Sequence, residues 1–261
     1  MISACRLAIA TACLVLAACG LANAEPADPI DRLIAAYPDH LARHERGFII
    51  WKDGTRMPFD DGKGPKSFAA RLLVPDIEDQ FYAPYPYGRS GLPPPHLADP
   101  GRVRNQAFFA RMYGDCRKGE VQKLLVDVAW LPRHGGGTLK VTRVNGVARQ
   151  LRRVSEDLER LPARFLRFLV PAAGAFNCRT IAGTARTSPH GFGIAIDIAT
   201  RPAHYWRWTK DARQGQAPYR NAIPWEIVEI FERHGFIWGG KWYHYDTMHF
   251  EYRPELLPAR R

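Results

Sequence analysis

The length and composition of the chain indicate a folded protein with one large domain, or with one domain and a substantial extension. It has 261 residues, of which 46% are hydrophobic, and it contains seven tryptophans that can anchor a core. No internal repeat or long low-complexity tract indicates a repeat protein or a disordered chain. The formal net charge of +11 at pH 7 favours an anionic partner, although a solvated basic surface without a special partner would carry the same charge.

The first residues have the pattern of a secretory signal sequence. Arg6 precedes a short apolar run that ends in small residues, and no other segment has enough apolar residues to span a bilayer. Cleavage after Ala24 would release a soluble protein, whereas a lipobox ending at Cys19 would produce a lipoprotein. We therefore expect a leader over residues 1–24 or 1–18 and export to the periplasm or cell envelope, with a membrane as partner only if Cys19 is lipidated.

Two cysteines, Cys116 and Cys178, remain after either form of processing. In an oxidising compartment such a pair is expected to form a disulfide, which would close a loop of about 60 residues. The alternative is two unrelated buried thiols.

Export and charge together narrow the class of partner. Nucleic acid would suit a basic protein, but an exported chain without a basic motif interleaved with aromatic residues does not favour it. A bacterial cell wall is rich in peptide carboxylates and fits both properties.

The region after the leader predicts a helix, a hairpin and a long loop. Asp28 followed by proline favours a helix start, and the residues after Gly47 suggest a strand, a turn at Asp53-Gly54 and a possible second strand. Residues 76–100 are rich in proline, glycine and tyrosine. We interpret them as an ordered loop over the body, or as a boundary between an N-terminal extension and the main domain.

The remaining sequence predicts helices that alternate with short strands. Asp99-Pro100 favours a helix that ends before Cys116, and Asn145-Gly146 suits the tight turn of a hairpin. An amphipathic helix follows that turn and ends before Pro162.

A second amphipathic helix, from Pro224 to Gly235, lies between two strand-like stretches, 193–199 and 247–253. The pattern predicts an α+β fold with a small antiparallel sheet flanked by helices.

One of these stretches, "SPHGFGIAIDIAT", places a carboxylate within an otherwise buried strand. An unpaired buried carboxylate is costly, so Asp197 should have an arginine, a hydrogen-bond network or a metal as partner. Because side chains alternate along a strand, Gly193, Ala195 and Asp197 would share one face with space above the carboxylate. His190 could bend back over that face from the turn before the strand.

The other stretch, "MHFEY", would direct His249 and Glu251 to one face, with Asp246 in the preceding turn. If the two strands are neighbours, His190, Asp197 and His249 can converge. Two imidazoles and one carboxylate with one open position have the composition of a catalytic zinc site.

These residues also carry a family resemblance. "SPHGFGIAIDI" resembles the S-x-H-x-x-G-x-A-x-D signature of the LAS zinc peptidases, which are D-alanyl-D-alanine carboxypeptidases, D-alanyl-D-alanine dipeptidases and L-alanyl-D-glutamate endopeptidases. "YDTMHFEYRPEL" resembles their second motif, an acidic residue three positions before the last zinc histidine. The resemblance covers about residues 165–257. It implies a Hedgehog/DD-peptidase-like zinc peptidase fold, with residues 25–105 as an N-terminal extension and residues 106–261 as the catalytic domain.

The resemblance also implies roles for individual residues. His190, Asp197 and His249 would bind Zn²⁺, Asp246 would be the general base, and Arg179 would hold the substrate or its polarised carbonyl.

Further positions have two interpretations each. Ser188 would contact the substrate or support the ligands from behind, and Arg186 could bind a substrate carboxylate or face solvent. Glu251 could accept a hydrogen bond from a zinc histidine, or form a surface salt bridge with Arg253 or Arg201.

The resulting prediction is an exported, monomeric zinc peptidase that cleaves peptidoglycan stem peptides with a metal-activated water. It would be of the D-alanyl-D-alanine carboxypeptidase or the L-alanyl-D-glutamate endopeptidase type, and the aspartate at position 246 favours the second. The alternative is a non-catalytic cell-wall-binding protein on the same scaffold. The intact set of His190, Asp197, His249 and Asp246 favours the enzyme, because a binding protein needs no general base.

Overall fold

The computed structural model describes residues 28–181, 183–209 and 217–258. The predicted leader and its two processing sites lie outside these ranges, so cleavage and lipidation stay predictions. No helix in the described ranges combines the length and the apolar character that crossing a bilayer requires.

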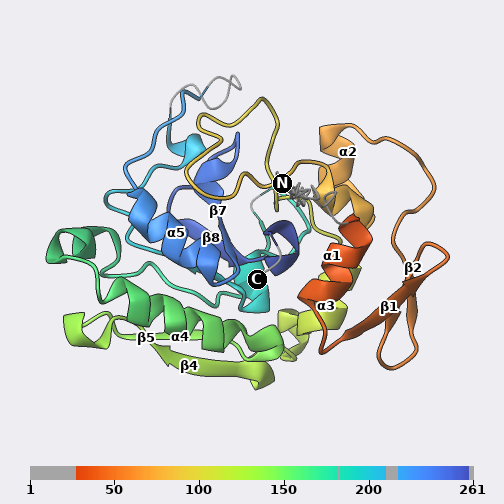
Figure 1. Cartoon of the computed structure of the whole chain (residues 1–261), viewed down its shortest axis with the longest axis horizontal. Coiled ribbons are helices and arrows are strands. Elements are labelled where there is room, and N and C mark those ends of the chain that lie inside the picture. The colour runs from red at the N-terminus through yellow and green to blue at the C-terminus, as the bar shows by residue number, and fades with distance from the viewer. Residues whose placement is uncertain (1–27, 182, 210–216, 259–261) are drawn as a thin grey trace, which may run out of the picture.

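The described chain forms helices and small antiparallel sheets (Figure 1). The α-helices are α1 (Pro29–Ala36), α2 (Phe68–Leu73), α3 (Gln106–Tyr113), α4 (Val147–Leu158) and α5 (Trp225–Arg233). The strands are β1 (Leu41–Glu45), β2 (Phe48–Trp51), β3 (Arg56–Pro58), β4 (Leu125–Ala129), β5 (Thr138–Thr142), β6 (Ala195–Asp197), β7 (Phe236–Trp238) and β8 (His249–Tyr252). They pair in the orders β1-β2-β3, β4-β5 and β6-β8-β7, and every pairing is antiparallel. The α+β class with small antiparallel sheets is confirmed, while the more specific zinc peptidase fold stays a prediction.

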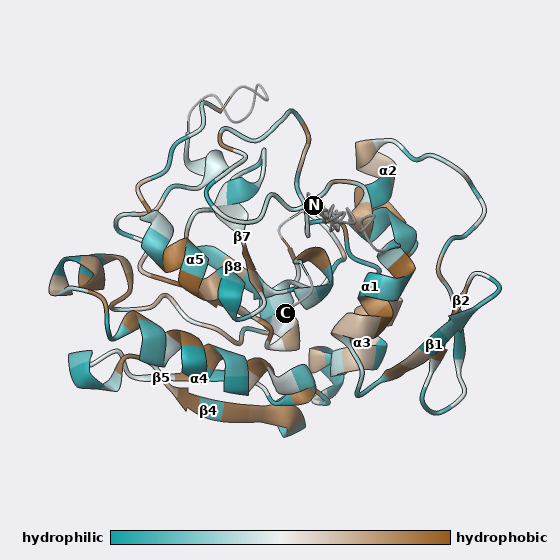
Figure 2. Cartoon of the chain, in the orientation of Figure 1, coloured by the Kyte–Doolittle hydropathy of each residue, from teal (hydrophilic) through white to brown (hydrophobic). Residues whose placement is uncertain are grey.

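The sheet β6-β8-β7 lies inside the molecule, with helices around it. Helix α5 packs on β7, and α4 packs on β4, β5 and α5 along the lower edge of Figure 1. Helices α1 and α3 and the sheet β1-β2-β3 lie at the right of the same view. Figure 2 shows that α4 carries many hydrophilic residues, whereas β4 is mostly hydrophobic, as expected for a helix that covers a sheet with one face.

One hydrophobic cluster joins the two parts of the chain. It extends from Ile30 in α1 to Tyr252 in β8, so residues from both sides of the predicted boundary near residue 105 pack together. Ile194, Ile196 and Ile198 belong to this cluster and are fully buried, which agrees with the predicted alternation along the strand that carries Asp197. The boundary itself stays a prediction.

Most strongly patterned elements occur where the sequence predicts them. Asp28 caps α1 by accepting a hydrogen bond from the Ile30 amide, and β2 and β3 form the predicted strand pair. Helices α4 and α5 are present as well, and α5 follows Pro224 directly. These predictions succeeded because helix caps and apolar periodicity depend only on residues that are close together in the sequence.

The predicted helix start at Asp99-Pro100 is wrong. Gly101 has a φ of +102°, which turns the chain out of a helical path, and α3 begins only after Asn105. The Asp99 carboxylate accepts a hydrogen bond from the His244 amide (2.9 Å) and lies 2.6 Å from His244 Nδ1. Asp99 therefore caps a distant turn instead of a local helix.

The predicted hairpin at Asn145-Gly146 is also wrong. Both residues have the left-handed backbone that such a turn requires, with φ of 52° and 70°. However, β5 pairs with the preceding strand β4, and the chain after Gly146 continues into α4. An Asn-Gly pair specifies the turn but not the element that follows it.

The predicted disulfide between Cys116 and Cys178 is confirmed. It joins residues 62 positions apart and anchors the loop that packs beside His190. The Asn177 amide donates to the His190 carbonyl (3.2 Å), and the Ser188 amide donates to the Arg179 carbonyl (3.0 Å).

We expect the double variant C116S/C178S to lose about 4 kcal/mol of unfolding free energy, because the open chain regains loop entropy in the unfolded state. Urea unfolding of the oxidised wild type and of the variant measures the difference. Reduction should destabilise the wild type to the level of the variant and leave the variant unchanged. Equal midpoints for variant and oxidised wild type would contradict the prediction.

Candidate metal centre

The pairing of β6 with β8 brings the two predicted motifs together. Asp197 lies directly opposite His249 in the antiparallel register, so both side chains project from the same face of the sheet. His190 lies in the short 3₁₀ turn Pro189–Phe192, which leads into β6 through Gly193. Gly193 has a φ of +67°, which ends the turn and makes β6 shorter than the predicted strand.

Three potential ligand atoms converge at this point. Asp197 Oδ1 lies 2.9 Å from His249 Nδ1 and 3.2 Å from His190 Nε2. The two ring nitrogens, His190 Nε2 and His249 Nδ1, are themselves 3.2 Å apart. Both imidazoles are buried.

These separations fit the ligand shell of a small divalent ion. Zinc binds nitrogen and oxygen donors at about 2.0–2.1 Å, and neighbouring corners of such a tetrahedron are about 3.3 Å apart. The three donors therefore lie at nearly the spacing that one shared ion requires, and only a slight outward shift would place an ion among them.

The other nitrogen of each imidazole faces an acceptor. His190 Nδ1 lies 2.5 Å from the Ala175 carbonyl, so it is the protonated nitrogen, and His249 Nε2 lies 3.3 Å from Glu251 Oε2. These contacts orient His190 Nε2 and His249 Nδ1 toward Asp197. An acceptor behind each ligating ring is the usual way in which proteins orient metal-binding histidines.

The electrostatics of the cluster favour a positive charge. Burial alone would raise the pKa of Asp197, but the charges and hydrogen bonds of His190 and His249 outweigh it and hold the pKa well below its ordinary value. Burial would lower the pKa of His249, yet its hydrogen bonds with Asp197 and Glu251 outweigh it and raise the pKa to about 10. A divalent cation bound here would replace the proton on His249 Nδ1.

Glu251 is not a surface residue, because its side chain is fully buried. Its Oε1 lies 3.0 Å from Arg253 Nη1, and its Oε2 lies 3.3 Å from Arg104 Nη1. Burial would raise the pKa of Glu251, but Arg104, His249 and Arg253 together lower it to about 2. The carboxylate therefore contacts both the histidine and one of the arginines, Arg253, that the sequence offered as alternative partners.

Asp246 lies in the turn before β8, near the three donors. Its Oδ1 is buried and has no hydrogen-bond partner among the described residues. Burial raises the pKa of Asp246 to about 6, with the attraction of His249 opposing the rise and the repulsion of Asp197 adding to it. A carboxylate in this state can exchange a proton near neutral pH.

The predicted substrate-binding residues lie in the segment of chain just before His190. Arg179 is exposed, and within the described ranges its guanidinium makes no hydrogen bond or ion pair. Ser188 is buried. Arg186 is half-buried, and its Nη1 donates to the Arg102 carbonyl (3.0 Å). The Arg186 side chain is therefore held against the protein by this hydrogen bond, whereas the Arg179 side chain is exposed to solvent.

Two groups that support the cluster, Arg104 and the carbonyl of Ala175, were not predicted from the sequence. Arg104 lies 147 positions before Glu251, and no local pattern connects the two. A backbone carbonyl leaves no signal in residue identity at all.

Two other features lie apart from this cluster. Asp60, Asp61 and Asp76 also come close to one another, but the Lys66 ammonium lies 3.1 Å from Asp61 and 2.5 Å from Asp76, so a cation of the chain already pairs with two of the three carboxylates.

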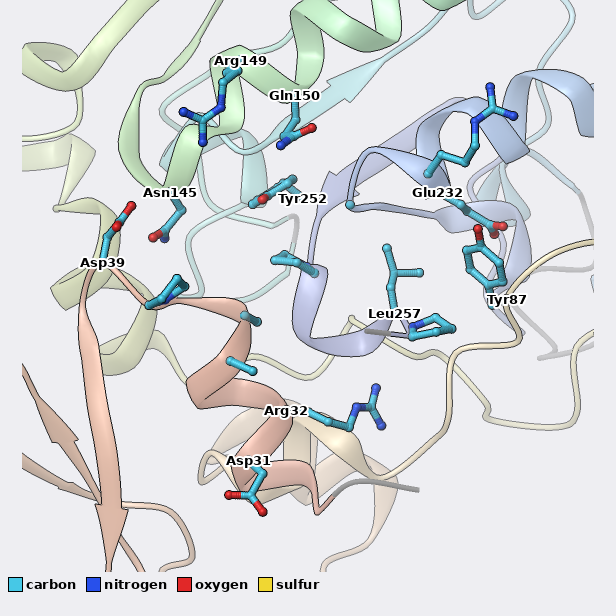
Figure 3. Close-up of a pocket in the computed structure, with 17 residues that line it drawn as sticks. Asp31, Arg32, Asp39, Tyr87, Asn145, Arg149, Gln150, Glu232, Tyr252 and Leu257 are labelled. Atoms are coloured by element: carbon cyan, nitrogen blue, oxygen red, sulfur yellow. The ribbon is translucent and has the colours of Figure 1, made fainter. Parts of the chain in front are cut away.

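A cavity of about 790 Å³ lies between α1, the start of α4 and the C-terminal turn (Figure 3). Its lining includes Arg32, Asn145, Gln150 and Leu257, and none of the predicted ligands.

Comparison with known proteins agrees with the motif resemblance. Neither the curated proteins nor the solved structures provide a match to this chain. A family model described as D-alanyl-D-alanine carboxypeptidase matches residues 182–252, which include all three converging donors and Asp246. Over this segment, the chain therefore resembles the D-alanyl-D-alanine carboxypeptidase family of zinc peptidases, as its two motifs predict.

Proposed function

We propose that this protein is an exported zinc peptidase that hydrolyses the stem peptides of peptidoglycan. The observation that carries the proposal is the convergence of His190 Nε2, Asp197 Oδ1 and His249 Nδ1 at separations of 2.9–3.2 Å. The family match over residues 182–252 supports peptidase activity. The leader-like start of the chain and its net charge of +11 support export and an anionic wall as partner.

His190, Asp197 and His249 would hold the zinc ion and leave one coordination position open. Zinc bound there would supply a Lewis acid and lower the pKa of a coordinated water to about 7.

Asp246 would act first as the general base and then as the general acid. Because its pKa is about 6, its carboxylate is ionised at neutral pH and can accept a proton from the attacking water. The same group can then deliver that proton to the leaving amine. Its Oδ1 has no other hydrogen bond among the described side chains to compete with this role.

Arg179 and Arg186 would bind the substrate from the loop between them. The Ile181 amide donates to the Arg186 carbonyl (2.9 Å) and the Ser188 amide to the Arg179 carbonyl (3.0 Å), so hydrogen bonds join the two flanks of this loop. A guanidinium on it would hold a substrate carboxylate or the developing negative charge of the scissile carbonyl. Ser188, at its base, would contact the substrate or support the ligands from behind.

The direct test is digestion of purified muropeptides with the zinc-loaded protein. We expect new amines and product masses that correspond either to loss of D-alanine or to cleavage between L-alanine and D-glutamate. D246N should lower the rate roughly 10²–10⁴-fold because the general base is lost. The control D127N changes an exposed aspartate paired with Lys140 and should keep the wild-type rate.

Two results would contradict this assignment. Equal product from the wild type and D246N would remove Asp246 from the mechanism. Retention on the wall without any product from the wild type would instead indicate the non-catalytic binding protein.

Zinc should also stabilise the folded state. At a free concentration about 1,000 times its Kd, zinc should add about 4 kcal/mol of unfolding free energy, because the unfolded chain lacks the preformed site. H190A should lose this gain, while H44A, which changes an exposed histidine paired with Asp31, should keep it. Urea unfolding in EDTA and in buffered zinc measures both, and a gain of equal size in H190A would contradict the proposed ligand set.

In the metal-free protein, D246N should increase stability at high pH. The folded pKa of Asp246, about 6, lies above its ordinary value of 3.8, so ionisation costs folding energy above pH 6 and costs nothing below about pH 4. We expect D246N to gain about 2–3 kcal/mol at pH 8 and almost nothing at pH 4. Urea unfolding in EDTA at the two pH values is the measurement, and a loss of stability at pH 8 would disprove the expected cost.

A further inference from the structure

The segment 98–104, which precedes the family match, packs directly behind the candidate metal centre. The Gly101 carbonyl accepts hydrogen bonds from Arg104 Nη1 (2.9 Å) and from Arg253 Nη1 (2.8 Å). A Cβ at Gly101 would lie 2.3 Å from Ile237 Cδ1 and 3.2 Å from Glu251 Oε1. The close approach and the positive φ together require glycine at this position.

Arg104 and His249 contact the same carboxylate oxygen. The Arg104 side chain is only 3% exposed, and its Nη1 lies 3.3 Å from Glu251 Oε2 and 3.5 Å from Oε1. His249 Nε2 lies 3.3 Å from the same Oε2. Arg253 instead contacts Oε1, at 3.0 Å. The two arginines therefore hold the two ends of one buried carboxylate, and Arg104 holds the end that faces the histidine.

We propose that Arg104 is a positioning residue of the metal centre, which acts through Glu251 to orient His249 for zinc binding. The inference rests on the proposed zinc site. Without Arg104, the buried Glu251 carboxylate would lose part of its charge compensation, and Oε2 would keep only His249 as a partner. Arg253, which lies 3.0 Å from Oε1, would then be the nearest remaining cation and would draw Glu251 toward itself and away from His249. A ligand histidine that loses its supporting acceptor typically binds metal about 10–100-fold more weakly.

The far end of the same network provides a matched control. Tyr37 is fully buried, and its hydroxyl donates to Glu255 Oε2 (2.6 Å), while Glu255 Oε1 accepts from Arg253 Nε (2.5 Å). The variant Y37F removes one buried hydrogen bond from this network without touching Glu251. It should reduce stability but not the orientation of His249.

The experiment measures the Kd of zinc by competition with a chromophoric chelator, for the purified wild type, R104M, R104K and Y37F. Circular dichroism at the same temperature checks that each protein is folded. We expect R104M to bind zinc about 10–100-fold more weakly than the wild type and Y37F to stay within about twofold. R104K keeps the charge but loses the planar fork, so it should recover part of the affinity.

The outcomes separate this inference from the proposed function. Zinc binding by R104M within about twofold of the wild type would overturn the positioning role, and so would equal weakening in R104M and Y37F, which would indicate general destabilisation. If R104M does not fold, R104Q, which removes the charge but keeps a polar side chain, is measured in its place, and zinc binding within about twofold of the wild type would again overturn the role. A wild type that binds no zinc would instead remove the proposed zinc site itself.

Discussion

The antiparallel pairing of β6 with β8 is the constraint on which the candidate metal centre depends. Three residue pairs place Asp197 opposite His249, and the 3₁₀ turn before β6 brings His190 to the same point. A slip of one residue would turn Asp197 to the opposite face of the sheet. The slip would leave the buried imidazoles of His190 and His249 without the carboxylate that they contact. The strand register therefore places the three side chains together, and their contacts in turn favour that register.

Charge balance extends this constraint into the core. Behind His249, carboxylates and guanidiniums alternate through Glu251, Arg253 and Glu255, with Arg104 beside Glu251. Each of these groups is almost fully buried, so removing one leaves its neighbour uncompensated, at a cost of about 3–5 kcal/mol. The candidate metal centre therefore depends on packing across the described chain, including residues before the family match.

The proposed chemistry uses two kinds of position. The donors lie on short, paired or hydrogen-bonded elements that hold them close together, while Asp246 and Arg186 lie in the turns around them. Asp246 combines burial with an oxygen that has no partner in the described chain, a combination that costs stability and keeps the carboxylate reactive. Buried ionisable residues with a shifted pKa are typical of functional sites.

The sequence by itself determined the local features: the caps and apolar faces of α1, α4 and α5, and which side chains share a strand face, since both depend on neighbours only a few residues apart. Its two motifs also identified the four residues that carry the proposed chemistry. Only the tertiary structure decided that β6 meets β8, that Asp99 caps a distant turn instead of a helix, and that Arg104 balances Glu251. Those contacts join residues up to 147 positions apart, where burial and charge compensation across the whole fold select the partner and no local pattern records the choice.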